Sequence, residues 1–581
     1  MQKSVYEFIS KTNNPAKDGA GDPIVEWKTC AISGKEFAVF QSDLVFYDKI
    51  SPTFAGKKFP IPAPTLCPEE RQRRRLAWRN ERKLYRRNCD ASNKQIISVY
   101  SPDKPYKVYE QPIWRSDSRD PLSYGKAFDF SRTFTQQMNE LIFNVLHPAL
   151  CNEYNTLVNS EYNNQTGNLK NCYMLSNSDY DEICLYGKWV NRCDKVIDAF
   201  KTYDSNNSYS AINCYNVSFC FYIYNCKDCF QCYNCCNLIQ CKFCIDSSNL
   251  VGQEYCINNT HYSKEEYEKL APQYRNNQLI IQWIQKNMDL IQTENCSGNF
   301  ISQCRNSHLC YDVEGMDASK YCCDLKKGQS DSVLNYDVSY FGAWLNYCYE
   351  GNTLWYGINK AYFSSDCRGN SNGIFYCHYC FDSSDCFGCI GLRNQSYCIF
   401  NKQYTKADYE KEVAKIIEHM QGTWERWEFL NPSMLPFGYN ETNASEYFPL
   451  TREEALTRWY KRQDKSYEPA IMDITKVLKW EQIPADISKV EESIVNEILI
   501  CEVSWRPYKI TKQELEFYRK HKLPLPKKHP DIRHLERLNK RPWRELYVRN
   551  CDKCGVEMLS VYPQDSDLKV YCEVCYNREV Y

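Results

Sequence analysis

Four cysteines near the end of the chain have the spacing of metal ligands. Cys551 and Cys554 form one C-x2-C pair, and Cys572 and Cys575 form another after seventeen intervening residues. Two short turns that each offer two thiolates complete the closed tetrahedral shell of a structural zinc site. We therefore predict that these four residues hold one Zn2+ in a zinc ribbon, with a hairpin over residues 557–570. A redox pair or a set of buried thiols is the alternative interpretation.

A degenerate copy of this module is found near the N-terminus. Residues 86–90 read RRNCD and residues 548–552 read VRNCD, and matching SVY and KVY segments follow in both copies. The offset between these matches stays at 462 residues, which indicates a duplicated module. The N-terminal equivalents of the four ligands are Cys89, Ser92, Glu110 and Ile113, so we expect no zinc there.

Each module also contains an earlier half-site that has lost two of its four ligands. The residues in question are Cys30, Ser33, Cys67 and Glu70 in the first copy, and Cys501, Ser504, His529 and Ile532 in the second. Two ligands are too few for a structural metal ion. Packing must therefore hold these lobes together.

Basic side chains are concentrated in one segment of a chain that is otherwise neutral. The chain has 72 basic and 73 acidic side chains, yet residues 71–87 read RQRRRLAWRNERKLYRR. On a helix several of these arginines would share one face, where guanidinium groups clamp phosphates and aromatic rings stack on unpaired bases. The alternative is a helix that pairs with acidic parts of the same chain. The predicted nucleic-acid-binding residues are Arg71, Arg73, Arg74, Arg75, Trp78, Arg79, Arg82, Lys83, Arg86 and Arg87.

Cysteine recurs at intervals of six residues in the middle of the chain. Cys220, Cys226 and Cys232 follow this interval, a second series is displaced by three residues, and further series occur within residues 304–322 and 377–398. An interval of six does not fit an α-helix and suits a solenoid of short strands. We expect cysteine, which is small and apolar, to fill the axis, with Tyr, Asn and Ser outside. A series of C-x2-C metal knuckles is the competing interpretation.

The two cysteine-rich blocks end alike. YCINNTHYSKEEYEK begins at residue 255 and YCIFNKQYTKADYEK at residue 397, and each contains a capping box that predicts a helix. Such helices would cover the exposed ends of a solenoid. Apolar spacing and a third capping box predict further helices over residues 134–145, over residues 280–288 and from Thr451.

Composition excludes several classes of protein. The N-terminus lacks the apolar core of a signal peptide, and no run of about 18 apolar residues predicts a membrane span. We therefore expect a cytoplasmic protein with no membrane partner, whose 34 cysteines are reduced, buried or metal-bound. The eight histidines are scattered, no catalytic motif occurs, and a shell of four cysteines leaves zinc no open position. We expect no enzymatic activity.

Several long motifs resemble an uncharacterised family of large, cysteine-rich, zinc-ribbon-containing proteins predicted in uncultivated bacteria with small genomes. The motifs are AWRNERKLYRRNC, SPDKPYKVY, NKQYTKADYEK, FGYNETNASEYFPLTREEA and VYCEVCYNREVY. The resemblance covers nearly the whole chain and implies ribbons at both ends of a cysteine-rich middle. It implies no established activity. The chain departs from the C-x2-C half-sites of this pattern at Ser33, Glu70, Ser92, Glu110, Ile113, Ser504, His529 and Ile532.

These observations predict a multidomain α+β protein in which duplicated zinc-ribbon-like terminal modules flank two cysteine-rich, parallel β-helix-like solenoid blocks with capping helices. As a function we expect a non-catalytic scaffold that binds nucleic acid or a ribonucleoprotein, with RNA or the ribosome favoured. The alternative is self-assembly or protein–protein contact through the solenoid. The predicted divisions are a tail (1–27), a degenerate module (28–120), a connecting helix (121–150), block 1 (151–260), a helical insert (261–295), block 2 (296–400), a packed connector (401–500) and the zinc-ribbon module (501–581).

Overall fold

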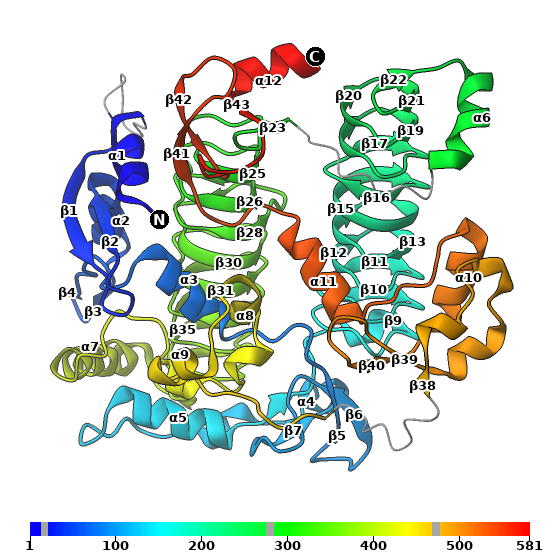
Figure 1. Cartoon of the computed structure of the whole chain (residues 1–581). Coiled ribbons are helices and arrows are strands. Elements are labelled where there is room, and N and C mark those ends of the chain that lie inside the picture. The colour runs from blue at the N-terminus through cyan, green and yellow to red at the C-terminus, as the bar shows by residue number, and fades with distance from the viewer. Residues whose placement is uncertain (13–20, 275–283, 468–476) are drawn as a thin grey trace.

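Stacked solenoid turns, each built from short β-strands, make up the centre of the molecule. The computed structural model describes residues 1–12, 21–274, 284–467 and 477–581. Fourteen strands, from β9 (Leu157–Val158) to β22 (Thr260–His261), form one sheet, and twelve, from β24 (Leu290–Ile291) to β37 (Lys402–Gln403), form another. Apart from the last pairing in each sheet, the strands are parallel. Figure 1 shows two columns side by side, the first rising and the second descending, which confirms the predicted β-solenoid architecture.

A repeat of three residues builds the first column. Every third residue from Leu169 to Ser247 is buried, and the residue before each of these has a positive φ near 50°. The sheet register advances by twelve residues per turn, as in the pairing of Phe200 with Ile212. Each turn therefore has four sides of three residues. The six-residue cysteine series seen in the sequence is every second core position of this shorter repeat.

Cysteine suits the core positions because a thiol is both apolar and a weak hydrogen-bond donor. The Sγ of Cys229 lies 3.2 Å from the carbonyl oxygen of Lys227 and 3.5 Å from that of Leu238. Thr202 donates to the carbonyl of Ala211 in the same relation. The small donor at each core position thus satisfies carbonyl groups that the tight corners turn inward. All the cysteines are free, so no disulfide contributes.

The predicted covering helices are present. The first column ends in α6 (Lys264–Tyr274), the second ends in α7 (Lys406–Gly422), and the capping residues of both make the expected hydrogen bonds. The helix before the first column is α5 (Phe134–Asn144), and the helix predicted from Thr451 is α9 (Arg452–Thr457).

The two terminal modules contain the same elements in the same order, displaced by 471 residues for the first helix and by 462 residues for the elements after it. Both modules have two helices and then a β-hairpin followed by a short third strand. The matching pairs are α2 (Gln41–Ile50) and α10 (Lys512–His521), α3 (Pro68–Leu76) and α11 (Pro530–Asn539), β5 (Tyr85–Asn88) and β41 (Tyr547–Asn550), β6 (Gln95–Ser98) and β42 (Glu557–Ser560), and β7 (Val108–Tyr109) and β43 (Val570–Tyr571).

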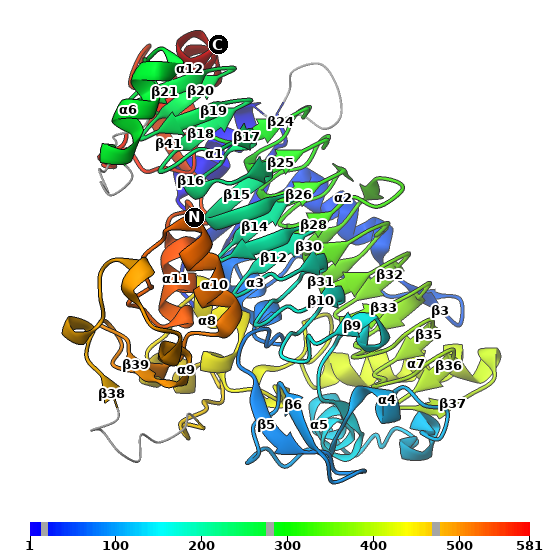
Figure 2. The same cartoon turned by 90° about the vertical axis from the view of Figure 1, so that its right-hand side faces the viewer.

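Each module contacts both columns. Strand β7 pairs with β8 (His147–Pro148) before the first column, while α3 packs on β30 (Tyr336–Gly342) of the second. The C-terminal module makes the same contacts with the columns exchanged. Strand β43 pairs with β23 (Gln285–Lys286) before the second column, while α11 packs on β14 (Phe200–Tyr203) of the first. Each module therefore joins the two columns. Figures 1 and 2 show this arrangement, with the blue module beside the green column and the orange helices on the teal column.

Three local predictions are wrong. Residues 1–27 are not a tail, because α1 (Lys3–Thr12) buries Val5 and Tyr6, and β1 (Ile24–Thr29) pairs with β2 (Glu36–Phe40). Strand β42 forms its hairpin with β41 and not within residues 557–570. Of the helix predicted over residues 280–288, residues 280–283 lie outside the described residues, and the strand β23 occupies residues 285–286 because it completes a sheet with β43.

Candidate functional site

The four C-terminal cysteines converge as a metal centre requires. Their sulfur atoms all lie within 4.8 Å of one another, and the Sγ atoms of Cys554 and Cys572 are 3.8 Å apart. Metal–sulfur bonds of about 2.3 Å in a tetrahedron give sulfur–sulfur distances of about 3.8 Å, so the geometry fits one ion. Cys551 and Cys575 are buried and Cys554 is exposed, which places the site at the surface of the module.

Local backbone structure positions these ligands. The first pair lies in a knuckle after β41, where Gly555, with φ of +75°, donates to the carbonyl of Cys551. The second pair lies at the start of α12 (Glu573–Val580), with Cys572 as its N-cap. Burial raises the pKa of the Cys551 thiol, but N–H groups of the surrounding backbone, including that of Cys572, outweigh it and lower this pKa to about 6. At Cys551 this environment favours the thiolate that a metal needs, whereas burial and the neighbouring thiols raise the pKa of Cys572 and Cys575.

The same knuckle occurs three more times without the ligand set. At residues 30–35, 89–94 and 501–506 a cysteine carbonyl accepts the same backbone hydrogen bond. At the N-terminal equivalent of the metal centre, Ser92 donates a hydrogen bond of 2.6 Å to Glu110, which replaces the metal by direct contact. Within the described ranges, the Cys551 group is the one set of three or more ligands close enough to share an ion. The middle cysteines form no such set within those ranges, and nearly all of them fill buried positions of the columns.

The first part of the basic segment is largely buried against the second column, so the arginines there are not available to a nucleic acid. Its helix α3 ends at Leu76, and Arg71, Arg75 and Arg79 are at most 2 % exposed. The Nε of Arg71 lies 2.9 Å and the Nη1 of Arg75 3.1 Å from the carboxylate of Asp337, which is itself fully buried in the second column. Arg74 contacts Glu350 of the same column at 3.3 Å.

The C-terminal module repeats this docking on the first column. Arg533 and Arg537, the counterparts of Arg71 and Arg75, both pair with the buried carboxylate of Asp198. Each lead arginine also lies over a tyrosine ring at 4.9 Å, Tyr321 in the second column and Tyr186 in the first. Two copies of one helix thus recognise equivalent corners of the two columns.

Most of the remaining residues predicted to bind nucleic acid are buried or have partners within the chain. Trp78 is buried, Arg73 pairs with Glu70, and Arg82 and Lys83 pair with Asp531 of the other module. Arg87 pairs with Asp90, and Arg86 is exposed. The segment is basic because it neutralises buried carboxylates, which the sequence offered as the alternative interpretation.

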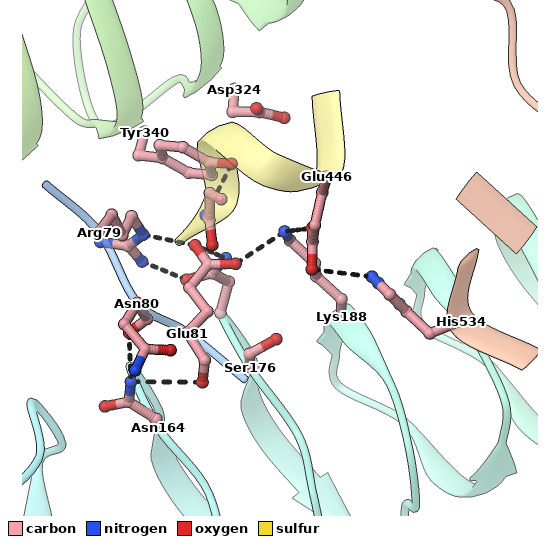
Figure 3. Close-up of polar contacts among 12 residues, drawn as sticks. Arg79, Asn80, Glu81, Asn164, Ser176, Lys188, Asp324, Tyr340, Glu446 and His534 are labelled. Atoms are coloured by element: carbon pink, nitrogen blue, oxygen red, sulfur yellow. Dashed lines mark hydrogen bonds and ion pairs between the residues drawn. The ribbon is translucent and has the colours of Figure 1, made fainter. Parts of the chain in front are cut away.

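A closed network of charges lies where the columns, α8 (Asn443–Tyr447) and α11 meet (Figure 3). The fully buried Nζ of Lys188 lies 2.7 Å from Glu81 and 2.9 Å from Glu446. Burial alone would lower the pKa of Lys188, but Glu446 and Glu81 outweigh it and raise this pKa. Burial lowers the pKa of His534 to about 4, so its imidazole ring is uncharged at neutral pH. A cavity of about 10 Å3 beside Arg79, Asn80 and Asn164 has room for one water molecule.

Comparisons with known proteins assign no family. No protein-family model and no curated protein matches the chain. One solved structure with a weak match is the crystal structure of a putative acetyltransferase from Desulfovibrio desulfuricans G20, with 8% identity, 38% of this chain and 63% of that chain covered, and a TM-score of 0.09. No helix in the described part of the chain is long and apolar enough to cross a membrane.

Replacing Asp337 tests whether the buried arginines dock the N-terminal module. In Asp337→Ala, Arg71 and Arg75 lose a shared carboxylate while remaining buried, and we expect a loss of roughly 3–5 kcal/mol in urea unfolding. The control is Asp204→Ala, which removes the partly exposed partner of the exposed Arg192 and should cost less than about 1 kcal/mol. Equal shifts in both variants would contradict the docking role.

Proposed function

We propose that this protein is a non-catalytic, zinc-containing scaffold that binds single-stranded nucleic acid, RNA in the first instance, through the outer face of its C-terminal module. The observation that carries the proposal is Trp505. This residue lies at the tip of the knuckle that begins at Cys501, and 77 % of its surface is exposed. The buried arginines Arg71, Arg74, Arg75 and Arg79 play no part in this binding.

Trp505 occupies a position where the other knuckles favour residues that tolerate a left-handed backbone. Its φ is +57°, and the equivalent positions in the other three knuckles are Gly34, Asn93 and Gly555. A bulky side chain in this conformation destabilises the fold by about 1–2 kcal/mol. The exposed indole ring makes few packing contacts within the chain that would offset this strain. A ligand that stacks on the ring supplies a reason for the residue.

The surface around Trp505 supports a polyanionic partner. Lys527 lies beside the knuckle, because its carbonyl accepts a hydrogen bond from the N–H of Glu502. The same module also has exposed lysines at Lys509, Lys512, Lys520 and Lys522. An exposed aromatic ring among lysines is the usual composition of a surface that binds unpaired bases and phosphates.

The metal centre supports the scaffold role. Four thiolates at tetrahedral distances suit Zn2+, and they leave no open position for a substrate or activated water. The ion would join the knuckle after β41 to the start of α12 and so fix the ribbon against the second column.

Metal analysis tests the zinc assignment. We expect one zinc per purified chain by inductively coupled plasma mass spectrometry, and its loss in Cys572→Ser, because three remaining thiolates do not close the shell. Cys89→Ser, which changes the matching position of the N-terminal module, should leave the zinc content at one. Equal zinc in wild type and Cys572→Ser would place the metal elsewhere.

Replacement of Trp505 tests the nucleic-acid proposal. In Trp505→Gly the relief of backbone strain offsets the extra flexibility of glycine, so the melting temperature should stay close to that of the wild type. Affinity for a labelled, unstructured 20-nucleotide RNA should fall about tenfold or more in fluorescence anisotropy, because a stacked base contributes about 1–3 kcal/mol. Lys527→Ala should reduce the salt dependence of binding. Unchanged affinity in Trp505→Gly, or no binding by the wild type at low salt, would refute the proposal.

A second candidate function, assembly with protein partners or further copies of the chain, is favoured by two other tryptophans. Trp424 and Trp459 follow the ends of α7 and α9, with φ of +60° and +65°, where helices commonly place glycine. They are 93 % and 79 % exposed. Exposed aromatic anchors are typical of interface centres.

Sedimentation velocity tests the assembly candidate. If these tryptophans mediate self-association, the wild type should form larger species as its concentration rises, and the double variant Trp424→Gly/Trp459→Gly should remain monomeric. Trp505→Gly serves as the matched control and should assemble like the wild type. A wild-type protein that stays monomeric at high concentration would remove self-assembly from consideration.

A further inference from the structure

Two cysteines of the N-terminal module lie where the C-terminal ribbon has metal ligands. Cys30 begins the turn at residues 30–35, as Cys551 begins the turn of the metal centre. Cys67 is the N-cap of α3, as Cys572 is the N-cap of α12. The backbone of this lobe therefore brings two thiols together, although the set of four ligands is incomplete.

The spacing within this half-site resembles that of the metal centre. The Oγ of Ser33 lies 3.7 Å from the Sγ of Cys67, and the two sulfur atoms in the matching places of the metal centre are 3.8 Å apart. Glu70, which stands in the fourth place, pairs with two arginines. Two thiols alone do not close the shell of a structural zinc ion, so the pair remains as free thiols.

The two thiols influence each other. Hydrogen bonding with the Cys67 thiol outweighs burial and lowers the pKa of Cys30 to about 4. The same contact, together with burial, raises the pKa of Cys67. Cys30 is thus the thiolate of the pair at neutral pH, and Cys67 is the neighbouring thiol. This is the arrangement of a reactive dithiol, because the thiolate is the nucleophile and the second thiol resolves its oxidised form.

The surroundings of this pair differ from those of the column cysteines. Core thiols of the columns donate to carbonyl oxygens, as Cys220 and Cys386 do at 3.3 Å. Among the described residues, neither Cys30 nor Cys67 donates to a carbonyl oxygen. The turn that begins at Cys30 lies at the surface, where Ile32 is 46 % exposed. A molecule almost as small as water therefore needs only a local opening of this turn to reach the two sulfur atoms.

We propose that Cys30 and Cys67 form a redox-active dithiol that hydrogen peroxide oxidises to a disulfide. The Cys30 thiolate attacks one oxygen of the peroxide, which breaks the O–O bond, forms a sulfenic acid and releases hydroxide. The Cys67 sulfur then attacks the Cys30 sulfur, and the hydroxyl leaves with the Cys67 proton as water. Two molecules of a small thiol such as glutathione reduce the disulfide and are themselves joined as a disulfide. This site is separate from Trp505 and does not depend on nucleic-acid binding.

The disulfide would join the first turn of the N-terminal module to the helix that docks this module on the second column. Cys67 directly precedes α3, and α3 carries Arg71 and Arg75, which pair with Asp337. In the reduced protein the turn and the helix are held together by packing. Oxidation would add a covalent bond between them and so fix the docking helix to the lobe that precedes it.

Peptide mapping of the full chain after treatment with hydrogen peroxide tests the proposal. The reduced protein is treated at neutral pH, the remaining thiols are alkylated under denaturing conditions, and the digest is analysed by mass spectrometry without a reducing agent. We expect a pair of peptides joined through Cys30 and Cys67, and its loss after incubation with reduced glutathione. Core cysteines of the columns, such as Cys220, should stay reduced in the same sample. Absence of the joined peptides would overturn the proposal.

Single substitutions assign the roles of the two sulfur atoms. Cys67→Ser keeps a hydroxyl beside Cys30 but removes the resolving thiol, so the sulfenic acid should accumulate at Cys30 and be trapped there by dimedone. Cys30→Ser should give neither the disulfide nor an adduct at Cys67. The matched control is Cys89→Ser, in the second turn of the same module, which should form the disulfide like the wild type. A dimedone adduct at Cys67 in Cys30→Ser, or none at Cys30 in Cys67→Ser, would contradict the assigned roles.

Discussion

The arrangement of the molecule depends on arginine–aspartate contacts buried between helices and columns. Asp337 and Asp198 lie at left-handed corners of the second and first columns, and each receives two arginines from one terminal helix. Removing one partner from such a pair leaves an unpaired buried charge, which is far more costly than the net stabilisation of the intact pair. The contacts therefore select one docking position for each helix. Because each module also adds a strand before the opposite column, the two modules hold the columns together.

The columns are able to receive these helices because of their unusual corners. A turn of twelve residues requires a left-handed residue at every third position, and that conformation carries a cost for every side chain except glycine. Compensation comes from ladders of identical groups on successive turns. The amide of Asn225 donates to Asn237, and that of Asn237 donates to Asn249, each at 2.9 Å. Corner side chains point outward, so an occasional aspartate there becomes a docking point.

The four knuckles show that one backbone turn serves different purposes in this chain. Where all four cysteines remain, at Cys551, Cys554, Cys572 and Cys575, the sulfur atoms converge on a metal-sized space. At Cys89 a serine–glutamate hydrogen bond takes over the same role. At Cys501 the turn carries the exposed Trp505, which the chain itself does not use for packing. The turn geometry is held by its backbone hydrogen bond, so ligands can be lost without loss of the fold.

The sequence by itself determined the features that are encoded within a few residues or by regular repetition. The spacing of the C-terminal cysteines, the capping boxes of α6, α7 and α9, the constant offset between the modules and the periodic cysteines all correspond to structure. Only the tertiary structure decided that arginines of the basic segment are buried, because Asp337, the partner of Arg71, lies 266 residues away in the sequence. Local signals depend on neighbouring backbone groups, whereas the role of a charged or polar side chain depends on the partner that folding brings to it.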